Sequence, residues 1–378
     1  MIPLNANLLN LKRSPIRLYT NLARQTPDCA MLTIGEPDLD TPEVIKAAAV
    51  AALADNQTHY APNQGTVSLR EAVAEFETNR GKPTKPDQVL ITIGACQALF
   101  TAMLGILNPG EEVIVPTPGF MLYEMIATVA GAKVVPLDIS KTGFQIDGDA
   151  LNGLISEKTK AIVLNSPCNP TGTVFNRESL DAVKQAVLGK PVFVICDGVY
   201  NQLTYTDYPD LSLDPQLQEQ MIFCQSFSKP YAMTGWRVGY LTCPEYVMDR
   251  LLLLSAATIT AVPTFLQTAA EAALKTDPAP MREIYRGRRD YVCDRLREMG
   301  LTYPEPEGAF YVFPDISKFG LGSEEFCTRM IREGGVAAVP GACFGAEGYI
   351  RLSYCYSDEE LKKGLDRMEA FIRRLLPE

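Results

Sequence analysis

Short apolar runs alternate with longer amphipathic segments through the middle of the chain. We predict strands at residues 89–93, 112–115, 133–137, 161–165, 192–196 and 221–224, because each is a brief apolar run bounded by turn residues. Between them, residues 96–107, 120–130 and 149–156 are predicted to form helices, and the turn NPTG at 169–172 is predicted to open another. This alternation favours an α/β fold with a mostly parallel sheet covered by helices.

The pattern changes near residue 282. A long charged helix at 282–299 precedes short strands around 310–313 and 349–353 and a final helix, which predicts a smaller α+β domain. The residues before about 45 carry little core of their own and are expected to pack with that domain. We therefore predict an N-terminal segment (1–45), a large domain (46–281) and a small domain (282–378).

Composition and charge exclude several classes of function. The chain has 378 residues and a net charge of −10 with no basic run, which weighs against nucleic-acid binding. No apolar stretch reaches membrane-spanning length, and no signal peptide is predicted. Ten scattered cysteines without a CxxC pair, and a single histidine, His59, favour a reducing cytoplasm and disfavour disulfides or a metal site.

One lysine stands where a ligand is expected. Residues 225–240 read QSFSKPYAMTGWRVGY, so Lys229 lies just past a predicted strand, behind Ser226 and Ser228 and ahead of Arg237. A lysine in such a place is most often solvated. In open α/β sheets, however, ligands bind at the carboxyl ends of strands, and hydroxyls with an arginine suit a phosphate. A lysine in a partly dry pocket there can act as a nucleophilic amine.

Other predicted strand ends add complementary groups. Asp197 follows the strand at 192–196 and is followed by Tyr200, Asn169 lies in SPCNPTG, and Ala95 and Cys96 open a helix after a strand. Each alone has an ordinary explanation as a cap, a turn or a βα junction. Together with Lys229 they suit a phosphorylated aldehyde cofactor that has a ring nitrogen.

Several motifs stand in a characteristic order. They are GEPD at 35–38, HYAPNQG at 59–65, SPCNPTG at 166–172, the Asp197-x-x-Tyr200 pair and SFSKPYAMTGWRVGY at 226–240. With these motifs the chain resembles the fold-type-I pyridoxal-phosphate aminotransferases of class I/II, near the aspartate, aromatic and kynurenine enzymes. The resemblance extends from GEPD to the arginine in YIRLSY and implies an aminotransferase that converts L-amino acids and 2-oxo acids by a ping-pong mechanism.

The resemblance also implies roles for residues around the cofactor ring. Lys229 would form a Schiff base with the cofactor's aldehyde and move the proton at the substrate Cα. Asp197 would keep the ring nitrogen protonated, while Asn169 and Tyr200 would hydrogen-bond the phenolic oxygen. Phe120 would stack on the ring.

Further roles concern the phosphate, the partner subunit and the substrate. The implied phosphate ligands are Ser226, Ser228, Arg237 and the backbone amides of Ala95 and Cys96. Tyr60 would reach the phosphate of a neighbouring subunit, which implies a homodimer with shared sites. Arg351, Gly35 and Asn169 would bind the substrate, with Arg351 holding its α-carboxylate.

The sequence motifs do not identify the amino-acid substrate. Some dicarboxylate-specific members of the family carry a lysine where this chain has Cys96. Arg17 lies in the N-terminal segment that often covers the pocket in this family, but it is equally well explained as an arginine on a helix surface. The difference at Cys96 favours a neutral, aromatic or sulfur-containing amino acid as the donor, with 2-oxoglutarate as the acceptor. The alternatives are an aspartate aminotransferase, a C–S β-lyase or an aminocyclopropane-carboxylate synthase of the same fold. An aminotransferase-like domain of a transcription regulator would need a DNA-binding domain before GEPD.

Overall fold

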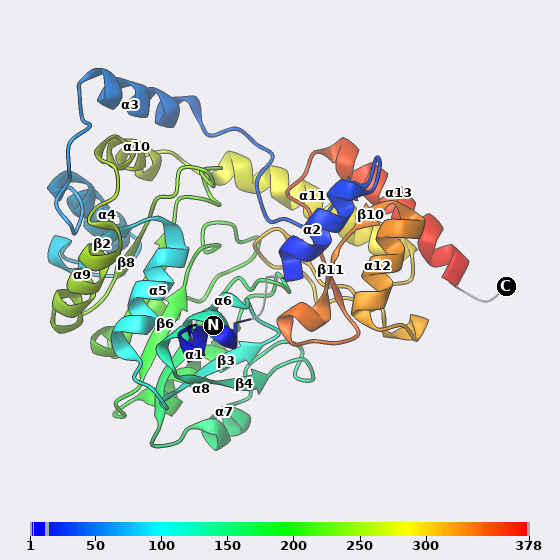
Figure 1. Ribbon diagram of the computed structural model, residues 1–378, viewed down its shortest axis with the longest axis horizontal. Coiled ribbons are helices and arrows are strands. Elements are labelled where there is room, and N and C mark those ends of the chain that lie inside the picture. Colours follow the sequence, from blue (N-terminus) through cyan, green and yellow to red (C-terminus); the bar gives the residue numbers. More distant parts are fainter. Residues whose placement is uncertain (1, 3, 12–14, 376–378) are drawn as a thin grey trace.

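The chain folds into a larger and a smaller body that lie side by side (Figure 1). The computed structural model describes residues 2, 4–11 and 15–375. The larger body contains a seven-stranded sheet of order β2-β8-β7-β6-β5-β3-β4. Its strands are β2 (Val89–Thr92), β3 (Glu112–Thr117), β4 (Lys133–Asp138), β5 (Thr159–Asn165), β6 (Phe193–Asp197), β7 (Met221–Ser226) and β8 (Gly239–Thr242).

The five strands from β7 to β4 run parallel, and β8 runs antiparallel to both of its neighbours. The predicted α/β class with a mostly parallel sheet is therefore confirmed. The strand β8 was not predicted, because its short run GYLT follows a glycine-containing turn and gives only a weak strand pattern.

Helices cover both faces of this sheet because successive strand residues point to opposite sides. In β5, for example, Ala161 and Val163 join one apolar layer, and Ile162 and Leu164 join the other. The first layer includes α5 (Gly94–Ile106), α6 (Leu122–Ala130) and α9 (Glu245–Ile259). The second includes α3 (Glu43–Ala54), α4 (Val67–Asn79), α7 (Gly148–Leu154), α8 (Arg177–Val187) and α10 (Thr264–Leu274).

The smaller body has its own apolar core. A three-stranded sheet β11-β12-β9 and a two-stranded parallel sheet β1-β10 are packed with helices in it. Its elements are α2 (Pro15–Gln25), β1 (Ala30–Met31), α11 (Ala279–Glu298), β9 (Tyr311–Val312), α12 (Ser323–Gly334), β10 (Val336–Ala337), β11 (Val339–Pro340), β12 (Ile350–Ser353) and α13 (Asp358–Leu375). The short helix α1 (Ala6–Leu9) instead lies against α6 of the larger body, where the Asn7 side chain hydrogen-bonds the Val129 carbonyl. The predicted boundaries at 45 and 281 stay a prediction.

Some predicted helix positions need correction. The NPTG turn does not open a helix directly, because α8 begins only at Arg177, where the Asn176 side chain accepts a hydrogen bond from the Ser179 N–H and caps it. The long helix predicted from 282 begins at Ala279, since a proline in its first turn fits a helix start. The helices α3, α4, α9 and α10 were not predicted as elements.

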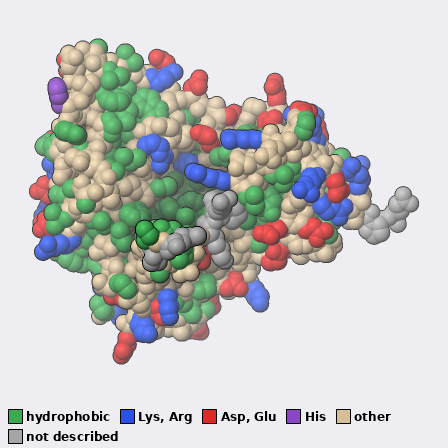
Figure 2. All heavy atoms as spheres, in the orientation of Figure 1, with side chains coloured by type: hydrophobic (Ala, Val, Ile, Leu, Met, Phe, Trp, Pro, Cys, Tyr) green, Lys and Arg blue, Asp and Glu red, His purple; other side chains and the backbone are tan. Residues whose placement is uncertain are grey.

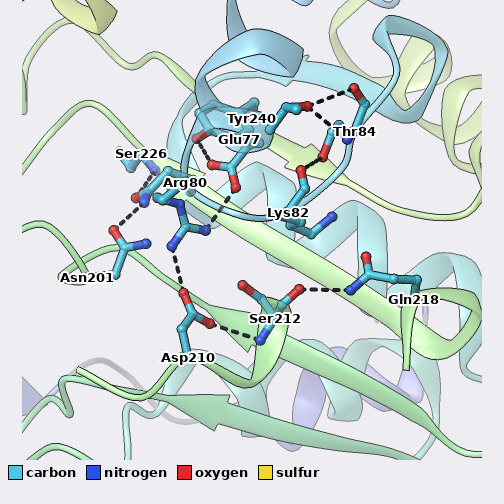
Figure 3. A network of polar contacts seen from close by, with 12 residues as sticks. Glu77, Arg80, Lys82, Thr84, Asn201, Asp210, Ser212, Gln218, Ser226 and Tyr240 are labelled. Atoms are coloured by element: carbon cyan, nitrogen blue, oxygen red, sulfur yellow. Dashed lines mark hydrogen bonds and ion pairs between the residues drawn. The ribbon is translucent and has the colours of Figure 1, made fainter. Parts of the chain in front are cut away.

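A buried polar network supports the sheet near β7 and β8 (Figure 3). Glu77, fully buried, accepts hydrogen bonds from Tyr240 (2.6 Å) and Arg80 (2.8 Å), and Arg80 also pairs with Asp210 (2.6 Å). In β7, the Gln225 side chain makes two hydrogen bonds: its Nε2 donates to Asn201 Oδ1 (2.7 Å), and its Oε1 accepts from the Ser226 N–H (2.8 Å). These bonds stabilise the strand end that leads to Lys229. Within the described part of the chain, no helix is long and apolar enough to cross a membrane.

Candidate active site

A cavity of about 260 Å³ opens where the carboxyl ends of the central strands meet the smaller body. Figure 2 shows hydrophobic and basic side chains gathered around the recess between the two bodies. The cavity is lined by most of the predicted site residues: Gly35, Ala95, Cys96, Phe120, Asn169, Asp197, Tyr200, Ser226, Ser228, Lys229, Arg237 and Arg351. Predicted site residues as far apart in the sequence as Gly35 and Arg351 therefore converge on one space.

Lys229 enters the cavity from the loop after β7. Its Nζ donates a hydrogen bond to the Gly35 carbonyl oxygen at 2.6 Å. Burial lowers the pKa of the Lys229 ammonium, and the nearby Arg237 charge lowers it further. A lysine held in this way gives up its proton more readily than a solvated one, as a nucleophilic or basic amine requires.

Asp197 ends β6 and lies on the floor of the cavity with an exposed fraction of only 5%. Tyr123 donates a hydrogen bond to its Oδ2 at 2.7 Å, and the Val199 N–H donates to its Oδ1 at 3.2 Å. Burial raises the pKa of the Asp197 carboxyl to about 6, against the lowering effect of these two bonds. A cationic group bound beside this carboxyl would keep it ionised.

The groups suited to a phosphate lie where β7 ends and α5 begins. The Ser226 hydroxyl donates a hydrogen bond to the Ser228 hydroxyl at 2.9 Å, and the Ser228 N–H donates one to the Ser226 hydroxyl oxygen at 3.1 Å. Arg237 adopts a left-handed backbone conformation (φ 57°), which is uncommon for a residue with a side chain. Its guanidinium lies against the start of α5, since a Cβ on Gly94 would meet Arg237 Nη2 at 2.8 Å. The free N–H groups of a helix start complete a site for an anion.

Arg351 comes from β12 and is nearly fully buried, with an exposed fraction of 2%. Its Nη1 donates to Asn169 Oδ1 at 2.7 Å and its Nη2 donates to the Thr33 carbonyl at 2.5 Å. Its guanidinium lies over the rings of Tyr311 (4.5 Å) and Phe344 (5.0 Å). The buried Nε has no partner within the described chain, so this arginine keeps a donor for an anionic ligand.

The Tyr200 hydroxyl forms a hydrogen bond with a residue that was not predicted to belong to the site. The Tyr200 and Tyr311 oxygens are 2.7 Å apart in a buried hydrogen bond. Gly35 must lack a side chain here, because a Cβ would lie 1.8 Å from the Tyr311 oxygen.

The remaining wall of the cavity is mainly apolar. It includes Phe120, whose ring meets Tyr123 edge-on at 6.0 Å, together with Ile16, Ile34, Leu99, Leu122 and Val199. Cys96, in the first turn of α5, is exposed and lines the same space.

Two residues that the sequence suggested for the site do not line the cavity. Tyr60 does not line the cavity of its own chain; its side chain is 92% exposed and borders a separate hollow formed with Val262 and Pro263. Arg17 is exposed on α2 and is absent from the described lining, although its neighbour Ile16 contributes to it.

Three lining or supporting residues escaped the sequence analysis. Tyr123 bonds Asp197, Asn165 bonds the Asp197 carbonyl (3.1 Å), and Tyr311 bonds Tyr200. Asn165 ends a predicted strand, and Tyr123 lies three residues after Phe120, so strand ends and helix spacing could have pointed to both. No pattern in the sequence relates Tyr311 to Tyr200.

These groups fit pyridoxal phosphate. Asp197 is placed to hold a protonated ring nitrogen, Lys229 offers an amine of lowered pKa, and two serines, Arg237 and a helix start offer a phosphate cradle. The partnerless Arg351 Nε adds a donor suited to a carboxylate. The cavity therefore has separate groups for the ring, the phosphate and a substrate.

Comparison with known proteins gives the same result. Residues 27–368 match the model of the family "Aminotransferase class I and II". A probable N-acetyl-LL-diaminopimelate aminotransferase of Bacillus subtilis is 39% identical over 376 residues, which cover 98% of this chain and 95% of the relative. An aromatic-amino-acid aminotransferase of Thermococcus litoralis is 39% identical over 373 residues, which cover 95% and 96%.

A solved structure is similar over the whole length. The aspartate aminotransferase of Thermus thermophilus, with maleate, has a TM-score of 0.93 and 36% identity, and the alignment covers 100% of both chains. The chain thus belongs to the class I and II aminotransferase family and is a pyridoxal-phosphate-dependent enzyme that exchanges amino groups between amino acids and 2-oxo acids.

Proposed function

We propose that this aminotransferase takes neutral, aromatic or sulfur-containing L-amino acids as its donors and 2-oxoglutarate as its acceptor. The observation that carries the proposal is the set of cations around the cavity. Among the described lining residues, only Lys229, Arg237 and Arg351 are basic. Each already has a proposed task, so no lining cation is left for the distal carboxylate of a dicarboxylic donor.

The apolar wall supports the same donors. With Phe120 assigned to the cofactor ring, Leu99, Leu122, Ile16 and Ile34 would be left against the side chain of a bound donor. A buried carboxylate without a partner is costly, whereas an apolar or aromatic side chain gains by leaving water. 2-Oxoglutarate would need a side chain outside the present lining to meet its second carboxylate; Arg17, next to the cavity-lining Ile16, is the candidate.

The proposed roles of the chain's own groups follow from their positions. Arg351 holds the α-carboxylate through a bidentate pair, which orients the donor's Cα toward Lys229. Lys229, deprotonated more easily because it is buried, accepts the Cα proton as a general base. Pyridoxal phosphate, when bound, supplies an electron sink for the carbanion left at Cα. Asp197 keeps the ring nitrogen cationic, and Ser226, Ser228, Arg237 and the Ala95 and Cys96 amides hold the phosphate.

Two further parts of the proposal concern assembly and location. Tyr60 is 92% exposed, and the exposed apolar residues Val44, Val50 and Leu53 of α3 support a homodimer in which Tyr60 reaches the partner's phosphate. Light scattering at assay concentration tests this: a fully active monomer would contradict it. The ten free cysteines support a reducing cytoplasm.

A donor panel tests the substrate proposal. Phenylalanine, methionine, leucine, aspartate and N-acetyl-LL-diaminopimelate are compared as donors by kcat/KM, with 2-oxoglutarate, pyruvate and oxaloacetate as acceptors. The proposal expects a neutral, aromatic or sulfur-containing donor to exceed aspartate. Aspartate as the best donor by tenfold or more would refute it. Ammonia and pyruvate released from cystathionine without any acceptor would instead indicate a C–S lyase.

A further inference from the structure

Tyr311 connects the residue proposed for the substrate carboxylate with one proposed for the cofactor. It lies in β9 with an exposed fraction of 2% and lines the cavity. Its oxygen is 2.7 Å from the Tyr200 oxygen, and its ring lies 4.5 Å from the Arg351 guanidinium.

The sheet of the smaller body fixes this position. Tyr311 in β9 pairs with Ser353 in β12, and Arg351 lies two residues before Ser353 on the same face of that strand. Diagonal neighbours of this kind lie within reach of long side chains. Gly35 leaves the space that the Tyr311 hydroxyl occupies, since a Cβ there would lie 1.8 Å from its oxygen. The position of the hydroxyl is therefore constrained from two sides.

The direction of the hydrogen bond between the two tyrosines follows from their proton count. A phenol has a single proton to donate. In the proposed function the Tyr200 proton is donated to the phenolic oxygen of the cofactor, so the 2.7 Å bond between the two tyrosine oxygens must use the Tyr311 proton. The cationic guanidinium of Arg351 over the Tyr311 ring favours the same direction, because a nearby positive charge makes a phenol a better donor.

We propose that Tyr311 is a positioning residue: it donates its proton to Tyr200, so that the Tyr200 hydroxyl donates into the cavity, toward the phenolic oxygen of the cofactor. The inference rests on the proposed function, in which Tyr200 binds that oxygen. A hydrogen bond donated to an anionic oxygen stabilises the anion and lowers the pKa of the group that bears it. Bonds in a chain polarise one another, so Tyr311 strengthens the bond that Tyr200 donates.

The test uses Tyr311→Phe, with Tyr205→Phe as a matched control. Tyr205 is also buried and its hydroxyl donates to the Ala309 carbonyl at 2.5 Å, two residues before Tyr311, but it does not line the cavity. The holoenzymes are titrated with acid and base, and the absorbance change of the bound cofactor gives a pH midpoint. Thermal unfolding of each apoprotein shows whether the variants fold equally well.

The proposal expects Tyr311→Phe to raise this midpoint by about half a unit, a roughly threefold change in the proton equilibrium. Tyr200→Phe should raise it further, and Tyr205→Phe should leave it at the wild-type value. An unchanged midpoint in Tyr311→Phe, with a raised one in Tyr200→Phe, would overturn the role of Tyr311 alone. No shift in Tyr200→Phe would overturn the role of Tyr200 on which the inference rests. Equal shifts in Tyr311→Phe and Tyr205→Phe would show a general loosening of the smaller body and would also overturn it.

Discussion

Replacing Cys96 by lysine should shift the donor preference of the enzyme toward dicarboxylic amino acids. Cys96 lies in the first turn of α5 and lines the cavity beside an apolar wall. A lysine there would add a fourth basic residue to Lys229, Arg237 and Arg351. Only a donor with a distal carboxylate can pair with it, so the gain should be selective.

Opposing effects set the size of this gain. Two unit charges about 4 Å apart attract by about 4 kcal/mol at an effective dielectric constant of 20. Against this, the new cation stands at a helix start, which costs about 0.3–1 kcal/mol. It is also repelled by Arg237, whose guanidinium lies against the same helix turn. Its exposure to cavity water weakens the attraction further. A net effect of about 1–2 kcal/mol corresponds to a change of about 5–30-fold in relative rate.

The assay compares kcat/KM for aspartate and phenylalanine in the wild type, in Cys96→Lys and in Cys96→Met. Methionine lengthens the side chain without adding charge, so it controls for a change of shape. The ratio of aspartate to phenylalanine should rise about 5–30-fold in Cys96→Lys only. This gain should shrink as salt is added, because salt screens exposed charges. A ratio that stays at the wild-type value, or that rises equally in Cys96→Met, would refute this account of the pocket.

Three further variants probe the cavity and its support. Arg351→Ala should lower kcat/KM for every donor by a similar factor of about 30 or more, since truncating one partner of a buried charged pair costs about 2–5 kcal/mol; a loss confined to one class of donor in the same panel would contradict the assignment. Burial raises the folded pKa of Asp197 to about 6 from 3.8, so its proton-linked stability is complete below pH 4 and is lost as the pH rises through 6. Urea unfolding of the apoprotein should therefore show Asp197→Asn gaining up to about 3 kcal/mol over the wild type between pH 4 and pH 7.5, and an equal difference at both pH values would disprove the shift. Glu77→Gln removes the charge of the fully buried Glu77, which pairs with the largely buried Arg80, and should lower the unfolding free energy by about 3–5 kcal/mol; Lys362→Ala, which breaks an exposed pair, is the control and should change it little.

The sequence predicted those site residues whose positions follow from a local pattern of strands and helices. Asp197 and Lys229 were placed together because each follows a strand in an alternating α/β pattern, and parallel strands end at the same edge of a sheet. Tyr311 could not be found in this way. It reaches Tyr200 across 111 residues, through the packing of the smaller body against the larger one, and no period or spacing encodes that contact.

The same limit explains the weaker element predictions. The strand β8 is short and antiparallel in a mostly parallel sheet, and it is specified by its pairing with β2 and β7 more than by its own residues. Tyr60 shows a different limit. Its motif suggested a role at the phosphate, but it does not line the cavity of its own chain, so the proposed role requires a partner subunit.

The most direct test of the account is to locate the covalent attachment of the cofactor. The yellow holoenzyme is reduced with borohydride and digested, and the peptides are mapped by mass spectrometry. The account predicts that the cofactor's mass is found on the peptide that contains Lys229, whose amine lies in the cavity at 2.6 Å from the Gly35 carbonyl. Lys229→Ala should bind the cofactor without this label and lose nearly all turnover. A label on any other lysine of the wild-type enzyme would contradict the proposed site.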